Sequence, residues 1–131
     1  MLEKRKGIPS LKGYYTAKSG EVFHYDSLSE LAVMMYYDER NYEWYKNTKL
    51  RIPYTFEGVE RKYIPDFIVG GELIVEIKGS KDKPELVSKI KAARNYCLQH
   101  NTTFELMDWQ TVKTLVDWNK VKEYHYQHVK K

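Results

Sequence analysis

One stretch of the chain, RKYIPDFIVGGELIVEIKGS at residues 61–80, constrains the fold more than any other. It contains two runs, 63–69 and 73–78, that are rich in Ile, Val, Phe and Tyr. The Gly70-Gly71 pair between them is a signal for a β-hairpin. The stretch therefore predicts two antiparallel strands joined by a short loop.

Each of these strands carries one acid, Asp66 or Glu76, at a position where a core strand normally has an apolar residue. A two-residue turn would put the two acids on opposite faces of the sheet. A three-residue loop that ends at Glu72 pairs Val69 with Leu73 and sets the two acids directly across from each other. Such loops with a left-handed Gly are common, so we expect the three-residue loop.

This register divides the hairpin into two faces that are both mostly apolar. The first face has Ile64, Asp66, Ile68, Ile74, Glu76 and Lys78. The second face has Pro65, Phe67, Val69, Leu73, Val75 and Ile77. A strand pair that is apolar on both faces is typical of the centre of a sheet covered on both sides.

Two facing carboxylates in a sheet repel each other and resist desolvation, so one should keep its proton unless a cation is present. Mg²⁺ removes this conflict, because it accepts oxygen ligands from one or two carboxylates and leaves positions for water and phosphate. Lys78 lies on the same face and could orient an attacking water or offset developing negative charge. The alternative is a structural ion-pair cluster of Asp66, Glu76 and Lys78.

The pattern PD-x(9)-EIK, formed by Pro65, Asp66, Glu76, Ile77 and Lys78, resembles the motif of the PD-(D/E)XK nuclease superfamily. The segments HYDSLSE and LRIPY precede the motif, and the whole series covers roughly residues 14–81. It is similar to TnsA-type transposon end-cleaving nucleases, tailed-phage head-completion nucleases and phage endonuclease I junction resolvases. The resemblance implies an αβββαβ core with a mixed sheet flanked by helices.

The resemblance also implies a metal site. Asp66 and Glu76 would hold Mg²⁺, for which Mn²⁺ can substitute, and the carbonyl of Ile77 would be a further ligand. Glu30 would bind a second ion or a water, as the acid that this superfamily places on the first helix. Ser27-x-x-Glu30 is also a capping box, and the structural and functional roles of Glu30 can coexist.

The remaining sequence predicts an α/β fold around this hairpin. The helix that opens at Ser27 is apolar nearly all round, which implies burial. The other expected elements are a hairpin at 14–25, an exit loop at 38–48, an edge strand at 50–56, a helix after Pro84, a fourth strand at 102–107 parallel to the third, and a last helix from Val112. Cys97 lies on the apolar stripe of the helix after Pro84 and is interpreted as a core residue.

We expect one domain at 13–118, preceded by a basic flexible arm at 1–12. Residues 119–131 form a basic helical extension or a mobile tail, and the spacing of His125 and His128 allows a metal site as an alternative. The amino terminus has no apolar segment and no apolar run approaches membrane-spanning length, so the expected location is the cytoplasm.

A formal charge of +4 and a pI near 9.0 are compatible with a polyanionic partner. Basic residues that could contact the DNA backbone flank the motif, although a solvated charged face explains them equally well. They are Lys49, Arg51, Arg61, Lys62, Lys81, Lys89 and Arg94.

These observations predict a Mg²⁺-dependent DNA endonuclease, encoded by a phage or another mobile element, in which Glu30, Asp66, Glu76 and Lys78 are catalytic. One motif set cuts one strand, so cutting both strands would require a homodimer or a partner subunit. The alternative is a non-catalytic DNA-binding or assembly protein on a nuclease-like fold.

Overall fold

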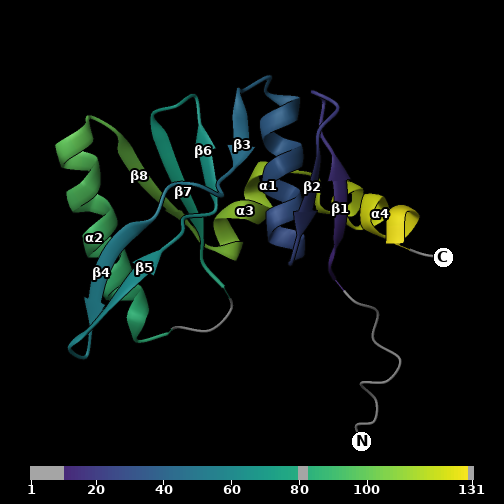
Figure 1. The fold of residues 1–131 in the computed structure, drawn as a ribbon. Coiled ribbons are helices and arrows are strands. Elements are labelled where there is room, and N and C mark those ends of the chain that lie inside the picture. The colour runs from purple at the N-terminus through teal and green to yellow at the C-terminus, as the bar shows by residue number, and fades with distance from the viewer. Residues whose placement is uncertain (1–10, 80–82, 130–131) are drawn as a thin grey trace, which may run out of the picture.

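The computed structural model describes residues 11–79 and 83–129, which form a mixed α/β fold (Figure 1). The elements are β1 (Gly13–Thr16), β2 (Val22–Tyr25), α1 (Leu28–Glu39), β3 (Trp44–Lys46), β4 (Ile52–Phe56), β5 (Val59–Tyr63), β6 (Phe67–Val69), β7 (Leu73–Ile77), α2 (Glu85–His100), β8 (Thr103–Met107), α3 (Trp109–Leu115) and α4 (Trp118–Val129).

The main sheet has four strands in the order β3-β6-β7-β8. Its first three strands are antiparallel, and β8 returns parallel to β7 after the α2 crossover. Val69 pairs with Leu73, so the three-residue loop and its register are confirmed. Gly70 and Gly71 both have positive φ, at 61° and 74°, which explains the glycine pair at this turn.

Helices cover both faces of this sheet, as the two apolar faces of the hairpin predict. Phe67 and Val75 pack with α1 in the larger core cluster, whereas Ile68 and Ile74 pack against Cys97 of α2 on the other face. Cys97 is 5% exposed, so its interpretation as a core residue is confirmed. The expected α/β architecture with a mixed, helix-flanked sheet is therefore correct.

Three details of the strand assignment are wrong. The expected exit loop at 38–48 contains β3, which is the edge strand of the main sheet. The strand expected at 50–56 is present as β4, but it pairs with β5 in a separate two-stranded sheet and not with the main sheet. The run at 63–69 is interrupted at residues 64–66, where Pro65 lacks the N–H that a continuous ladder requires.

The C-terminal segment is a packed helix rather than a mobile tail. In α4, Val121 and His125 have no exposed surface, and the ring of His125 lies 2.7 Å from the hydroxyl of Tyr25. His128 contacts the carbonyl of Tyr124 at 2.8 Å. The two histidines therefore make separate contacts, His125 with Tyr25 of β2 and His128 within its own helix. Residues 1–10 of the expected basic arm lie outside the described residues.

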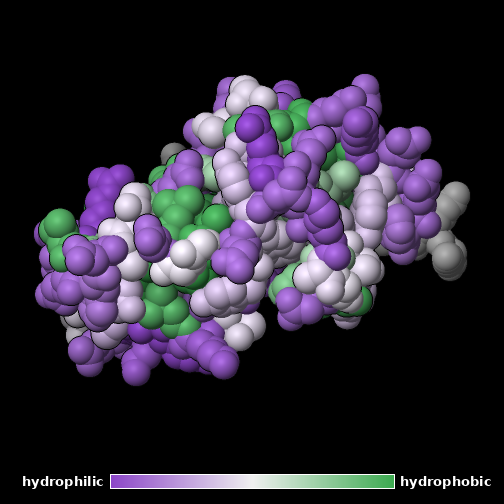
Figure 2. Space-filling view, turned by 90° about the horizontal axis from the view of Figure 1, so that it is seen from above, coloured by the Kyte–Doolittle hydropathy of each residue, from purple (hydrophilic) through white to green (hydrophobic). Residues whose placement is uncertain are grey.

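Hydrophilic side chains cover most of the surface seen from above, with a hydrophobic area over the half of the molecule that carries the sheet and α2 (Figure 2). Among the described residues, no helix combines the length and the apolar character needed to cross a bilayer.

Candidate active site

Asp66 lies immediately before β6, where the strand breaks away from β7. Extending the ladder by two residue pairs would place the carbonyl of Pro65 against the amide of Ile77. That carbonyl instead accepts a hydrogen bond of 3.0 Å from the side chain of Asn47. The carboxylate of Asp66 takes its place and accepts from the Ile77 amide at 2.7 Å. The Asp66 side chain therefore replaces a backbone carbonyl as the acceptor for the Ile77 amide.

Glu76 is the residue of β7 that lies across from Asp66 in this register. Its carboxylate accepts a hydrogen bond of 2.8 Å from the hydroxyl of Tyr63, a side chain that is 3% exposed. Tyr63 ends β5, so the separate hairpin reaches the main sheet at this residue. The sequence pattern does not predict the contact of Tyr63 with Glu76, because it favours one long strand that includes Tyr63.

Burial is the main reason why both carboxyl groups resist ionisation. It raises the pKa of Glu76 to about 8, with a further rise from the charge of Asp66. Burial likewise raises the pKa of Asp66 to about 6 against the lowering effect of the Ile77 hydrogen bond. The two groups also interact through a side-chain hydrogen bond, so one proton between them is the favoured state near neutral pH. The two acids therefore meet, as the register predicts.

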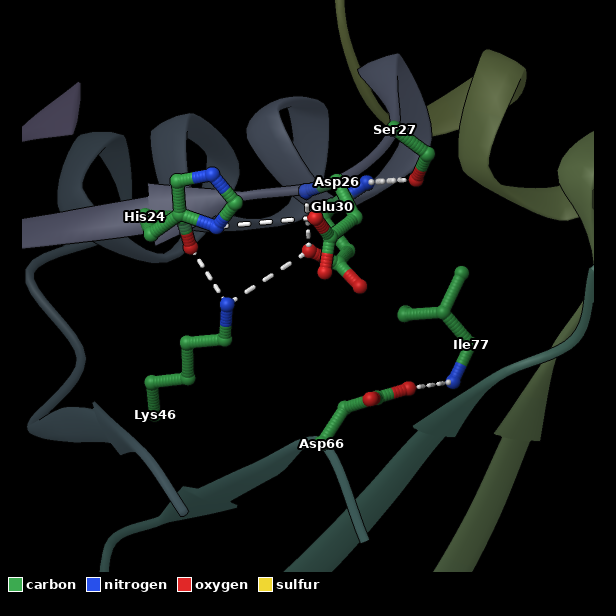
Figure 3. A network of polar contacts seen from close by, with 7 residues as sticks. All are labelled: His24, Asp26, Ser27, Glu30, Lys46, Asp66 and Ile77. Atoms are coloured by element: carbon green, nitrogen blue, oxygen red, sulfur yellow. Dashed lines mark hydrogen bonds and ion pairs between the residues drawn. The ribbon is translucent and has the colours of Figure 1, made fainter. Parts of the chain in front are cut away.

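Glu30 lies in the first turn of α1, on the Asp66 side of the site (Figure 3). Its amide donates to the hydroxyl of Ser27 at 3.1 Å, which confirms the capping box. A capping box predicts that the Glu30 carboxylate accepts from the Ser27 amide, but it accepts from the amide of Asp26 at 2.8 Å, so that half of the expected cap is wrong. The charge of Glu30 adds to the burial-driven rise in the pKa of Asp66, which places the capping acid close to the site.

Lys46 of β3 is a residue of this site that the sequence analysis missed. Its ammonium lies 3.6 Å from the carboxylate of Glu30 and donates to the carbonyl of His24 (Figure 3). It also partly offsets the burial-driven rise in the pKa of Asp66. The adjacent aromatic residues Trp44 and Tyr45 were the available signal, since aromatic side chains are enriched in strands.

Lys78 follows β7 directly, and its amide donates to the carbonyl of Met107 at 2.8 Å. Strand alternation puts its side chain on the Glu76 side of the sheet. The pKa of Asp108 is lowered mainly by the hydrogen bond from Thr111, and the charge of Lys78 contributes as well. The catalytic role of Lys78 stays a prediction.

The candidate DNA-binding residues come from several elements, and their role stays a prediction. Arg61 pairs with Glu85 at 3.1 Å, and Lys89 lies over the rings of Tyr54 and Tyr63 at 5.9 and 5.6 Å. Arg94 is exposed on α2, Arg51 and Lys62 are exposed at the β4–β5 hairpin, and Lys49 lies beside β3. Lys81 lies outside the described residues.

Within residues 11–79 and 83–129, no group of three His, Cys, Asp or Glu side chains stands close enough to form a ready metal cluster. A Mg²⁺ site needs fewer protein ligands, because the ion keeps several waters. The coupled pair of Asp66 and Glu76 meets this requirement. The Ile77 amide points toward Asp66, and in a strand the carbonyl of the same residue points the same way. The donor set therefore fits a hard divalent cation.

A family model described as TnsA-like endonuclease N terminal matches residues 38–108, which is more than half of the 131-residue chain. The matched segment runs from the end of α1 to the residue after β8 and contains Asp66, Glu76 and Lys78, but not Glu30. No curated protein and no solved structure matches the chain.

Proposed function

The chain belongs to the TnsA-like endonuclease N-terminal family of the restriction-endonuclease-like, PD-(D/E)XK superfamily, and from this premise we propose that it is a divalent-metal-dependent DNA endonuclease. The reaction would be hydrolysis of phosphodiester bonds, with Mg²⁺ as the physiological ion and Mn²⁺ as a substitute. A phage or mobile-element origin is part of this proposal and rests on the resemblance of the motif series.

The observation that carries the proposal is the carboxyl pair of Asp66 and Glu76. Both groups are half-buried, they face each other across neighbouring strands, and both have raised pKa values. Such a pair destabilises the fold unless a proton or a cation lies between the two groups. Perturbed acids of this kind concentrate at functional sites.

The residues divide the chemistry among them. Asp66, Glu76 and the carbonyl of Ile77 would hold the ion, and Glu30 would orient a water or a second ion. A bound divalent ion supplies Lewis-acid chemistry, which activates water and neutralises phosphate charge. Lys78 would orient the attacking water and stabilise the negative charge that develops on the phosphate oxygens.

A plasmid-nicking assay tests this function. The purified protein is incubated with supercoiled plasmid in Mg²⁺, Mn²⁺ or EDTA, alongside Asp66→Ala and the control Glu123→Ala, which changes an exposed acid of α4. We expect nicking by the wild type and the control in either metal, and none in EDTA or by Asp66→Ala. Nicking by Asp66→Ala at the wild-type rate would defeat the assignment. DNA binding without any cleavage would favour the non-catalytic alternative.

Double-strand or junction cleavage would need two copies of this site, because one carboxyl pair serves one phosphodiester. We therefore propose that a second copy or a partner subunit joins the chain on such substrates. Linear duplex, supercoiled plasmid and a four-way junction, compared in the same assay, show which substrate is cut fastest.

A further inference from the structure

A groove of about 610 Å³ lies between β2 and β3 on one side of the candidate site. Its lining consists of residues 21–24 together with Tyr45, Lys46, Thr48 and Lys49. We call this feature the β2–β3 groove. The lining combines two lysines, an imidazole, a threonine hydroxyl and two aromatic rings with a single acid, Glu21. Lysines interleaved with an aromatic ring are typical of surfaces that bind a nucleic-acid strand.

The β2–β3 groove borders the candidate site at Lys46. Lys46 lines it and also contacts Glu30, whose charge acts on Asp66 (Figure 3). The same lysine bridges to the carbonyl of His24 on the opposite wall. A strand bound in the β2–β3 groove therefore comes close to Glu30 and to the Asp66 side of the site through Lys46.

The far side of the groove is held rigidly to the site. The side-chain oxygen of Asn47 accepts from the amide of Lys49 at 3.2 Å, and its nitrogen donates to the carbonyl of Pro65 at 3.0 Å. The amide of Asn47 also donates to the carbonyl of Asp66 at 2.9 Å. Lys49 thus keeps a fixed position relative to Asp66, and this positioning requires no rearrangement when a substrate binds.

The site lies below the surface, which limits the form of substrate that can reach it. The Glu30 side chain is 14% exposed and the Lys46 side chain 23%, while Asp66 and Glu76 are half-buried. A single sugar-phosphate backbone enters such a recess more easily than a base-paired duplex. Tyr45 is 49% exposed at the groove and offers a ring face to an unpaired base.

We propose that the β2–β3 groove binds the unpaired nucleic-acid strand that leads into the carboxylate site. Lys49 and Lys46 contact its phosphates and Tyr45 stacks on one of its bases. This inference rests on the proposed nuclease function and deepens it, since it names a substrate with an unpaired segment at the cut. Duplexes with a single-stranded tail or a locally opened region meet that description, whereas blunt, fully paired duplexes do not.

The test measures equilibrium binding by fluorescence anisotropy in EDTA, where no cleavage occurs. The probes are an oligothymidine of about 12 nucleotides, a blunt duplex and the same duplex with an oligothymidine tail. The variants are Tyr45→Ala and Lys49→Ala. Their matched controls are Tyr126→Ala, since Tyr126 of α4 is also 49% exposed, and Lys122→Ala on the exposed side of the same helix.

We expect the tailed duplex to bind more tightly than the blunt one, and Tyr45→Ala to weaken tailed binding by about tenfold. Lys49→Ala should lower the slope of log affinity against log salt by about 0.7 for the oligothymidine. The controls should bind like the wild type. Equal affinity for blunt and tailed duplexes, or groove variants that behave like their controls, would overturn the proposal.

Plasmid nicking by the same preparations separates this inference from the function on which it rests. If the wild type nicks plasmid, Asp66→Ala does not, and the groove variants bind like the wild type, then the strand-binding proposal for the groove is wrong and the nuclease assignment stands. Binding that depends on Tyr45 and Lys49, without nicking in any metal, supports the groove as a strand-binding site and overturns the nuclease.

Discussion

The carboxylate of Asp66 accepts a 2.7 Å hydrogen bond from the backbone amide of Ile77, at the ladder position that belongs to the carbonyl of Pro65. The strand can leave the sheet at this point without orphaning the amide, because the side chain takes over a backbone acceptor role. The hydrogen bond with the Ile77 amide also fixes the Asp66 carboxylate beside Glu76. The fold and the proposed chemistry thus both depend on the carboxylate oxygens of Asp66, and a conservative substitution of Asp66 can separate the two roles.

Asp66→Asn should leave the fold almost unchanged and reduce cleavage by about 100-fold or more. The amide oxygen of asparagine can still accept from Ile77, but the side chain no longer supplies a negative charge to a divalent ion. Asp66→Ala loses the acceptor as well, so its free energy of unfolding should fall by a further ~1–3 kcal/mol. Urea denaturation and plasmid nicking measure the two effects.

A loss of stability in Asp66→Asn as large as that in Asp66→Ala would contradict this separation. It would mean that the negative charge, and not the acceptor oxygen, holds the Ile77 amide in place. Circular dichroism of both variants serves as the control for an intact fold.

Stability without metal should fall as the pH rises. Glu76 has a folded-state pKa of about 8 against an ordinary value of 4.5, and Asp66 has about 6 against 3.8. The folded chain therefore binds more protons than the unfolded chain between these values, so the free energy of unfolding decreases with pH in that window. The stabilising proton is fully present below about pH 4 and is lost as the pH passes 8.

Urea midpoints measured in EDTA from pH 5 to about 8.5 test this slope. Glu76→Gln cannot ionise at this position, so its midpoint should depend less on pH and should exceed that of the wild type at the alkaline end. A wild-type midpoint that rises from pH 5 to 8 faster than that of Glu76→Gln would contradict the raised pKa values.

Divalent metal should reverse the alkaline loss of stability. An ion that binds only the folded chain adds about 2.7 kcal/mol at a concentration 100 times its dissociation constant. The increase in Tm with Mg²⁺ should be larger at pH 8 than at pH 6, because protons compete with the ion for Asp66 and Glu76. Thermal melts of the wild type, Asp66→Asn and Glu76→Gln provide the measurement. An equal increase in all three proteins would place the ion elsewhere.

The central hairpin could be predicted from the sequence because its constraints are local. Two glycines that tolerate positive φ determine the loop, and two apolar faces make a one-residue slip costly. The register of Val69 with Leu73 and the meeting of Asp66 with Glu76 followed from these features alone. The parallel return of β8 followed from the length of the α2 crossover.

The rest of the site depends on contacts that no local pattern specifies. A proline in a strand-like run signals a break, but not that Asn47, which follows the neighbouring strand β3, donates to its carbonyl. Tyr63 contacts Glu76 and Lys46 contacts Glu30 because β5 and β3 end beside these acids. The positions of both residues depend on which sheet each strand joins. The burial of His125 likewise depends on its contact with Tyr25, one hundred residues earlier in the chain.

Tyr63→Phe should move the acid limb of the cleavage pH profile upward by as much as about one unit. The hydroxyl of Tyr63 donates to Glu76 and lowers the pKa that burial raises, so its removal makes Glu76 harder to ionise. Tyr54→Phe is the matched control, because Tyr54 is also buried and donates to a glutamate, Glu85. The rate of nicking against pH is the measurement. A pH profile that shifts equally in Tyr63→Phe and Tyr54→Phe would show that Tyr63 has no specific role in the site.

Asn47→Ala should destabilise the fold by about 3 kcal/mol and impair cleavage even where the variant is fully folded. Asn47 is 6% exposed and its side chain satisfies the carbonyls of Leu50 and Pro65 and the amides of Lys49 and Leu50. Removal leaves these backbone groups without their partner and releases the segment that carries Asp66.

Asn47→Asp distinguishes the two halves of this role. It keeps the acceptor for the Lys49 and Leu50 amides but cannot donate to Pro65, so the loop should stay ordered while the Pro65 tether is lost. We expect a loss of stability at least as large as in Asn47→Ala, because the carboxylate is buried against the carbonyl oxygens of Leu50 and Pro65, and a comparable loss of cleavage, measured by urea denaturation and plasmid nicking. Asn119→Ala, at an exposed position of α4, is the control. Wild-type cleavage by Asn47→Asp would show that the Pro65 tether is dispensable and that the Ile77 amide alone positions Asp66.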